Sequence, residues 1–344
     1  MLLHVVHETH YLYTPAVENA HHVVHLKPID HASQTLQSHK LRISPAPAQQ
    51  RDVPDVYGNY RTFFSLQTSH DSLSVVADSI VSTTPVAPDV DFRAHGESEP
   101  SWEQVRDQFR YSAGAAWNGA SEFLFASPYV PRDDAFVQFA RPSFAPGRPL
   151  PEAAHDLMER IHRAMVYESN STEVNTPALV ALRQGKGVCQ DFAHIMVACC
   201  RAMGLPARYV SGYMLTKPPP GQPRLIGSDA SHAWASVYCP GPTHSAGRWL
   251  DFDPTNDRPP GEDYVTLATG RDFLDVSPMR GVIRGGARHI LDVAVTVEPV
   301  EETMQAMQPG NNANTHASQQ SQQTQQGYVQ DQGWMPWSGG QQQG

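Results

Sequence analysis

A cysteine stands where a glycine-led turn runs into a predicted helix, in the segment Gly187-Val-Cys-Gln-Asp-Phe-Ala-His194. Apolar residues recur at steps of three and four from Phe192 to Met203, and Gly204 ends the pattern, which predicts an amphipathic helix that begins near the cysteine. Free N–H groups at the start of a helix carry partial positive charge and favour a thiolate over a thiol. Cys189 is therefore the candidate nucleophile.

Two predicted strands downstream supply a base and an acid. Residues 232–238 alternate aromatic and β-branched residues with small ones, and residues 247–253 indicate a second strand that ends before Pro254. If these strands are antiparallel neighbours, His232 and Asp253 come together. The imidazole would then accept the thiol proton, while the carboxylate orients the ring and stabilises the imidazolium. We prefer Asp253 to Asp251 because it stands at the strand end, although strand parity points both carboxylates to one face.

These segments belong to a larger pattern. Its further members are Thr176-Pro177, the segment from Gly204 to Tyr213, Ser231-His-Ala-Trp234 and Phe252-Asp-Pro-Thr-Asn256. The combination resembles the bacterial transglutaminase-like proteins, a superfamily with a papain-like cysteine-enzyme core. The resemblance implies that Cys189, His232 and Asp253 form a catalytic triad.

The resemblance continues on both sides of the core. Tyr13-Thr-Pro15 and Asp55-Val-Tyr-Gly58-Asn59 resemble parts of the N-terminal β-sandwich domain of these proteins. Gly270-Arg-Asp272, Asp275-Val276 and Arg280-Gly281 resemble the segment that follows their core. The charged residues of that segment are equally consistent with a structural ion-pair network and with one wall of a substrate cleft.

We therefore predict an α+β protein, with an N-terminal β-sandwich followed by a papain-like transglutaminase core. Residues 1–86 carry short alternating apolar runs between Pro, Gly and Asn, which is typical of an all-β domain. Residues 87–150 are Pro-rich and aromatic and are predicted to connect the domains. An amphipathic helix over about 150–165 opens the core, which we place at 151–300. The Gln-rich residues 303–344 are expected to be disordered.

Charge and cysteine content restrict the location and the partners. The formal net charge of -10 offers no basic footprint for nucleic acid. No apolar run approaches the roughly 20 residues that span a bilayer, and the first residues lack the positive and apolar regions of a secretory signal. Four cysteines, two of them adjacent, do not suggest a disulfide framework. We expect a cytoplasmic protein that binds neither nucleic acid nor membrane; its oligomeric state stays open.

The histidines raise the question of a metal site. His7-Glu-Thr-His10 is one candidate, and His21-His-Val-Val-His25 has the outer spacing of a zinc-protease helix. However, His22 replaces the glutamate that acts as general base in that motif, and the flanking β-branched residues favour strands. In a strand, side chains four residues apart lie too far apart for the helical chelate. We therefore predict no metal site.

Several residues near the candidate triad have a structural alternative. His194 lies five residues beyond Cys189, which turns it away from the thiol on a helix, and we take it as structural. Trp234 is expected to share a strand face with His232, where it either shields the imidazole or packs in the core. Gln184 is a weaker candidate for an oxyanion donor than the Cys189 N–H. The remaining thiols, Cys199, Cys200 and Cys239, are interpreted as packing residues.

The predicted activity is acyl transfer on amide bonds, with a peptide or protein amide as substrate. Attack by Cys189 releases an amine and leaves a thioester. If water resolves the thioester, the protein is a cysteine peptidase or amidase, which we favour; if an amine resolves it, the protein is a protein-glutamine transamidase. A third hypothesis is a catalytically silent binding or scaffold protein, in which the β-sandwich and the Gln-rich tail carry the function. The chemistry requires no cofactor.

Overall fold

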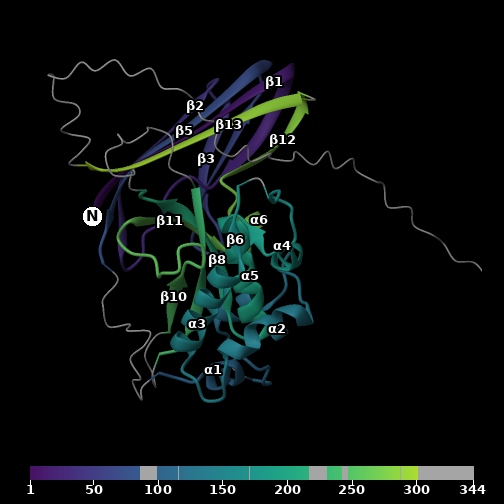
Figure 1. The fold of residues 1–344 in the computed structure, drawn as a ribbon. Helices are drawn as coiled ribbons and strands as arrows, with labels where there is room; N and C mark the ends of the chain where they lie inside the picture. Colours follow the sequence, from purple (N-terminus) through teal and green to yellow (C-terminus); the bar gives the residue numbers. More distant parts are fainter. Residues whose placement is uncertain are drawn as a thin grey trace, which may run out of the picture.

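The computed structural model describes residues 1–85, 99–114, 116–169, 171–216, 231–241, 247–286 and 288–300. The predicted Gln-rich tail at 303–344 lies outside the described residues. Within the described residues, two larger sheets, a two-stranded ladder and a set of helices make up the fold, with the largest sheet at one end and the helices at the other (Figure 1). Across the part of the chain that the structure describes, no helix is long and apolar enough to cross a membrane.

The larger sheet has seven antiparallel strands built around one long strand, β1 (Leu2–Val24). The first half of β1 pairs with β5 (His70–Thr83) and β13 (Arg288–Pro299), and its second half pairs with β4 (Tyr60–Leu66) and β12 (Met279–Gly285). The remaining strands are β2 (Gln34–Ser44), beside β5, and β3 (Gln49–Pro54), beside β4. The all-β character predicted for the N-terminal region is confirmed, but its strands form one curled sheet because β1 belongs to both halves.

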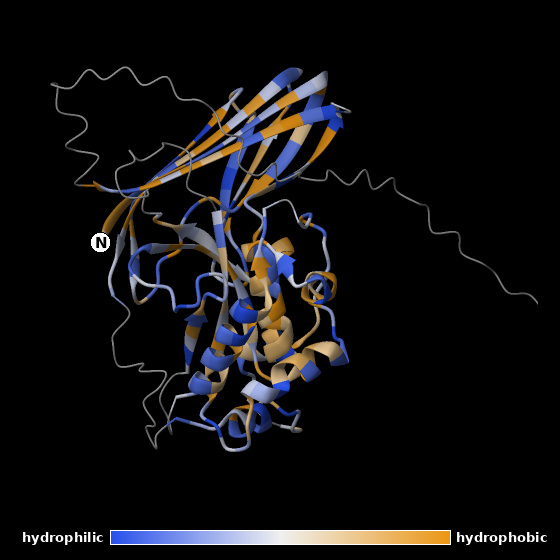
Figure 2. Ribbon diagram, viewed as in Figure 1, coloured by the Kyte–Doolittle hydropathy of each residue, from blue (hydrophilic) through white to orange (hydrophobic). Residues whose placement is uncertain are grey.

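Alternation of apolar and polar residues creates the inner face of this sheet. Along much of β1, buried residues alternate with more exposed ones, and Leu3, Val5 and Val17 are fully or almost fully buried. Figure 2 shows the same alternation along the strands of this sheet, against more continuous apolar character in the central helices. The inner face packs on Tyr213 and Val265 of the second sheet, which fixes the two sheets against each other.

The second sheet has four antiparallel strands in the order β10-β9-β8-β11. These strands are β8 (Ala207–Met214), β9 (Ser231–Cys239), β10 (Arg248–Phe252) and β11 (Tyr264–Gly270). Helix α5 (Cys189–Ala202) packs along β8 and β9, and its residues from Gln190 to Arg201 are buried. A two-stranded parallel ladder of β6 (Val166–Tyr167) and β7 (Lys186–Gly187) lies just before α5.

Further helices surround α5. They are α1 (Trp102–Gln108), η1 (Gly119–Leu124), α2 (Asp134–Ala140), η2 (Arg141–Ser143), α3 (Leu150–Ala164), α4 (Ala178–Gln184) and α6 (Phe273–Val276). The helix predicted over about 150–165 and the helix that begins at the cysteine are confirmed, as are the strands around His232 and before Pro254. Their periodic apolar residues meet in one core, for example Leu157 and Met158 of α3 with Phe192 of α5.

Packing divides the chain differently from the predicted domain boundaries. Strands β12 and β13, which lie within the predicted core at 151–300, pair with β1 in the N-terminal sheet. Trp102 and Phe136, in the segment predicted to be a connector, lie in the core cluster around α5. Both differences have one cause: pairing and packing partners far away in the sequence leave no mark on a local pattern.

Candidate active site

Cys189 is the first residue of α5, and the turn before it is fixed by a side chain of the same helix. Asp191 accepts the Val188 N–H at 2.8 Å and the Thr172 hydroxyl at 2.6 Å. Burial outweighs these hydrogen bonds and raises the pKa of Asp191. Gly187 is needed here because a Cβ at this position would lie 2.6 Å from Asp191 Oδ2. The thiol is thus held at a helix start, where the N–H of Cys189 has no intrahelical partner.

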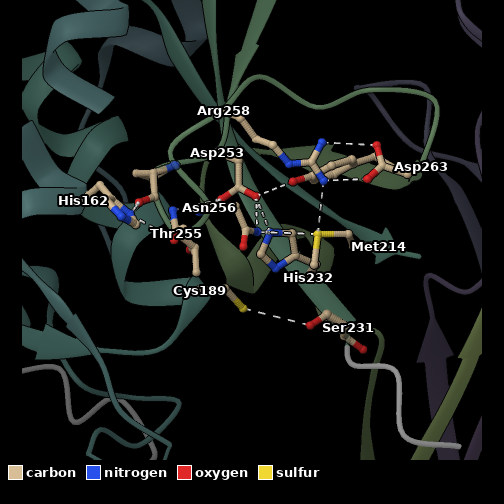
Figure 3. Close-up of polar contacts among 12 residues, drawn as sticks. His162, Cys189, Met214, Ser231, His232, Asp253, Thr255, Asn256, Arg258 and Asp263 are labelled. Atoms are coloured by element: carbon tan, nitrogen blue, oxygen red, sulfur yellow. Dashed lines mark hydrogen bonds and ion pairs between the residues drawn. The ribbon is translucent and has the colours of Figure 1, made fainter. Parts of the chain in front are cut away.

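His232, near the start of β9, reaches Asp253, just after β10, across the two strands. Nε2 of His232 lies 2.7 Å from Oδ2 of Asp253, and the side chains are 8% and 0% exposed. Since Nε2 is committed to the carboxylate, Nδ1 is the ring nitrogen left to interact with sulfur. The half-buried Cys189 side chain stabilises the charged form of the His232 ring, and its Sγ lies 4.0 Å from the Ser231 carbonyl oxygen (Figure 3).

A tight turn after β10 surrounds Asp253 with hydrogen-bond donors. Oδ1 accepts the backbone N–H groups of Thr255 at 2.9 Å and of Asn256 at 3.3 Å. Oδ2 accepts the Asn256 side-chain amide and the Tyr264 hydroxyl, each at 2.7 Å, in addition to His232. The turn closes through a backbone pair between Asp253 and Arg258.

The electrostatics of the pair favour a charged ring. Burial disfavours the imidazolium, but the hydrogen bonds to Asp253 and Cys189 and the charges of both groups outweigh it and raise the pKa of His232 from 6.5 to about 10. Burial likewise opposes the charge on Asp253, yet the hydrogen bonds from His232, Asn256 and Tyr264 and the His232 charge lower the pKa of this carboxyl group. A protonated imidazole beside an ionised carboxylate is therefore the stable state at neutral pH.

The structure separates the two candidate acids. Asp253 contacts His232, whereas Asp251 pairs within the sheet opposite Ser236 and its charge acts on His31 and Arg208. The shared strand face expected from parity does not apply, because β10 ends at Phe252 and Asp253 already belongs to the turn. The position of the turn thus decides which carboxylate reaches the imidazole.

Other residues singled out in the sequence have structural contacts. His194 is fully buried, and its Nε2 accepts the Phe273 N–H at 3.1 Å; burial lowers the pKa of His194 to about 3. Trp234 is also fully buried, with its ring centroid 6.2 Å from that of His232. Gln184 is exposed at the end of α4. The other three cysteines are buried free thiols.

The charged segment after β11 forms an ion-pair network. Arg271 donates to both carboxylate oxygens of Asp275, at 2.9 and 3.1 Å. Asp272 caps α6 and accepts the Tyr129 N–H, and Arg280 donates to the Leu274 carbonyl oxygen. Of the two alternatives for this segment, these contacts favour the structural one.

The histidines of the N-terminal sheet are strand residues. His21 and His22 lie within β1, and His22 stacks on Phe64 of the neighbouring strand. Nδ1 of His25, just after the strand, donates to the Ser277 carbonyl oxygen at 3.0 Å. Within the described residues, no group of three or more His, Cys, Asp or Glu side chains is placed to hold a metal ion.

Sequence reasoning missed two residues that contact the His–Asp pair. Asn256 lies within the segment 252–256 that carried the resemblance, but nothing in the spacing gave its side chain a role. Tyr264 lies eleven positions beyond Asp253 at the start of β11. Only the strand order indicates the contact between Tyr264 and Asp253. Strands β10 and β11 lie on opposite edges of the four-stranded sheet, and the chain between them crosses from one edge to the other.

The sequence matches the Transglutaminase-like superfamily over residues 138–254 and the Bacterial transglutaminase-like N-terminal region over residues 3–82. Uncharacterized proteins of Mycobacterium tuberculosis (strain ATCC 25618 / H37Rv) and Mycobacterium bovis are each 40% identical to it over 300 residues, which cover 86% of this chain and 92% of theirs. One from Mycobacterium leprae is 30% identical over 301 residues, which cover 86% of this chain and 98% of that protein.

A solved structure shows the same fold. A Cytophaga hutchinsonii protein, solved as a candidate cysteine protease, superposes on this chain with a TM-score of 0.65 at 20% sequence identity. The superposition covers 87% of this chain and 90% of the other. Both the N-terminal sheet and the core are therefore shared.

Proposed function

Because the chain belongs to the bacterial transglutaminase-like family, we propose that it is a thiol enzyme that cleaves amide bonds through Cys189, His232 and Asp253. The observation that carries the proposal is the buried His232–Asp253 contact of 2.7 Å beside a thiol at the start of a helix. The favoured acceptor is water, which makes the protein a cysteine peptidase or amidase.

The first half-reaction starts from a thiolate beside an imidazolium. The Cys189 thiolate attacks the amide carbon, and the electron pair of the C=O bond moves onto oxygen, where the Cys189 N–H stabilises it. When the oxyanion collapses, the C–N bond breaks and His232 gives its Nδ1 proton to the departing amine. A thioester and a neutral imidazole remain, and Asp253 keeps the Nε2 proton of the ring in place.

The second half-reaction restores the site. Neutral His232 takes a proton from water as the water oxygen attacks the thioester carbon. The tetrahedral intermediate expels the Cys189 thiolate and releases a carboxylic acid. The resulting imidazolium again faces the thiolate, so the starting charge state returns without a cofactor.

A second candidate function is transfer of the acyl group to an amine, as the family match to a transglutaminase-like core suggests. The first half-reaction is the same, and only the acceptor differs. Glutamine-containing peptides incubated with a labelled primary amine distinguish the two by mass spectrometry. A free acid product supports the hydrolase, and an amine adduct supports the transamidase.

The test of either activity is Cys189→Ala. We expect this variant to form neither product, because it lacks the atom that carries the acyl group. Cys200→Ala is the matched control, since Cys200 is a buried thiol on the same helix. Equal turnover by Cys189→Ala and the wild type would overturn the proposal, and no turnover by either would favour the scaffold hypothesis.

We also propose that the enzyme works in a reducing, cytoplasmic setting. All four cysteines are free thiols, and the nucleophile is partly exposed, so oxidation would remove its nucleophilicity. Cell fractionation with an antibody against the chain tests this location. Recovery of the protein outside the cytoplasmic fraction would contradict it.

A further inference from the structure

Tyr264 makes a hydrogen bond to the triad that the proposed chemistry does not use. Its hydroxyl donates to Asp253 Oδ2 at 2.7 Å, on the same oxygen that faces His232. The side chain is 4% exposed, so water does not compete for this contact. An ionised carboxylate only accepts hydrogen bonds, which fixes the tyrosine as the donor.

The Asn256 side chain completes the set of donors on this oxygen. Its amide nitrogen lies 2.7 Å from Asp253 Oδ2 and 3.3 Å from His232 Nε2. The Nε2 proton points to Asp253, so this nitrogen cannot accept from Asn256, and the amide proton goes to the carboxylate. Asp253 Oδ2 thus accepts hydrogen bonds from His232, Asn256 and Tyr264.

The ring of Tyr264 is held independently of its hydroxyl. The Arg258 guanidinium lies 4.6 Å from the ring centroid, and Trp234 packs edge-on with a centroid separation of 5.4 Å. Arg258 is itself paired with Asp263 through both of its terminal nitrogens. A phenylalanine at this position would therefore keep the packing and remove only the donor.

From this geometry we infer that Tyr264 is a positioning residue of the site, whose hydroxyl keeps Asp253 ionised in one orientation and limits how strongly it holds the His232 proton. The inference rests on the proposed function, because it assigns the hydroxyl a purpose in that reaction. The imidazolium must give its Nδ1 proton to the leaving amine, and a carboxylate with too much unshared charge at Nε2 would stabilise the imidazolium and make it a weaker acid.

The charged groups around the imidazole determine whether loss of the Tyr264 hydroxyl raises or lowers the pKa of His232. Cys189 faces the ring from α5, and Asp253 faces it from the turn after β10. Tyr264 approaches from the start of β11. Arg258 lies over its ring and is paired with Asp263. Loss of the hydroxyl leaves more negative charge on Asp253 Oδ2 and stabilises the imidazolium, so it raises the pKa of His232 above its value of about 10.

The experiment is a pH titration of His232 by NMR in full-length protein labelled with ¹⁵N-histidine, with the resonance assigned by its absence in His232→Gln. For Tyr264→Phe we expect the midpoint to rise by about half a unit to one unit relative to the wild type. Tyr213→Phe is the matched control, because it removes another buried hydroxyl, one that contacts His7 at 2.8 Å. We expect no shift for the control.

An unchanged or lowered midpoint in Tyr264→Phe would overturn the inference, as would an equal shift in Tyr213→Phe. The proposed function is tested separately in the same samples by alkylation of Cys189 with iodoacetamide. If the wild-type thiol is not alkylated preferentially, the proposed function is contradicted, while the titration still reports the effect of the hydroxyl on His232.

Discussion

At the scale of single residues, Asp253 determines the state of the imidazole that faces Cys189. Its carboxylate is buried, ionised and surrounded by donors, so it presents one oxygen to His232 Nε2 in a fixed direction. This arrangement leaves Nδ1 for the thiol. Substitutions that keep the size of Asp253 but change its charge therefore probe orientation and electrostatics together.

We predict that Asp253→Asn lowers the rate of amide cleavage by about 10²–10⁴-fold, because an amide does not stabilise the imidazolium and permits the wrong tautomer. The steady-state rate on a peptide amide substrate measures this loss. Asp251→Asn is the control and should retain the wild-type rate, because Asp251 contacts neither His232 nor Cys189 in the described residues. Equal losses in both variants would contradict the assignment of Asp253.

The pKa of His232 makes a prediction for stability. Since the pKa rises from 6.5 to about 10 on folding, the charged ring contributes stability that is complete below pH 6.5 and is lost as the pH rises through 10. The difference in unfolding free energy between the wild type and His232→Gln should therefore be larger at about pH 6 than at about pH 10. Urea denaturation at both pH values measures this difference in unfolding free energy. A difference that is larger at the higher pH would contradict the prediction.

The sequence was sufficient to predict that Cys189, His232 and Asp253 come together, but not to predict the contacts that support them. Cys189 and His232 each stand in a short motif with a local structural context, and the structure brings them together with Asp253. Their catalytic role stays a prediction. Asn256 and Tyr264 were missed because a hydrogen bond between side chains of different elements depends on the turn geometry after β10, which spacing does not encode.

At the scale of elements, the backbone at the start of α5 is held closely around Cys189. Asp191 reaches back from the first turn of the helix to the Val188 N–H, and Gly187 gives it the room to do so. Thr172 ties the preceding loop to the same carboxylate. The helix was predictable from its apolar period, whereas this reach-back contact was not, because its hydrogen-bond partners are backbone and loop groups.

We predict that Gly187→Ala destabilises the protein by about 1–3 kcal/mol, because the new Cβ overlaps the Asp191 carboxylate. It should also slow the alkylation of Cys189, because the turn before the thiol has to move. Gly119→Ala is the control, since a Cβ there meets nothing within 4 Å. Thermal unfolding and the rate of alkylation by iodoacetamide measure the two effects, and wild-type behaviour of Gly187→Ala would refute this account of the turn.

At the scale of the whole molecule, strands from both ends of the described chain form one sheet. Strands β12 and β13 pair with β1, so residues beyond 278 complete the sheet that residue 2 starts. Predicted boundaries followed local composition and the order of motifs, and for that reason they ended the N-terminal domain near residue 86. Only long-range pairing reveals that the first sheet needs both ends of the described chain.

We predict that Val297→Ala destabilises the protein by about 1–3 kcal/mol, since Val297 is fully buried in the core of the N-terminal sheet. Val282→Ala is the control on β12, where the side chain is 71% exposed, and should change stability little. Chemical denaturation measures both. Equal stability of the two variants would show that the C-terminal strands are not an integral part of the sheet.

The central claim is that His232 holds one sulfur, Cys189, in its ionised form. The most direct measurement is alkylation with iodoacetamide across a pH series, with the modified cysteine mapped by mass spectrometry in the wild type and in His232→Ala. We predict selective modification of Cys189 in the wild type, and loss of that selectivity in the variant. Equal modification of all four cysteines in the wild type, or an unchanged pH profile in His232→Ala, would contradict the claim.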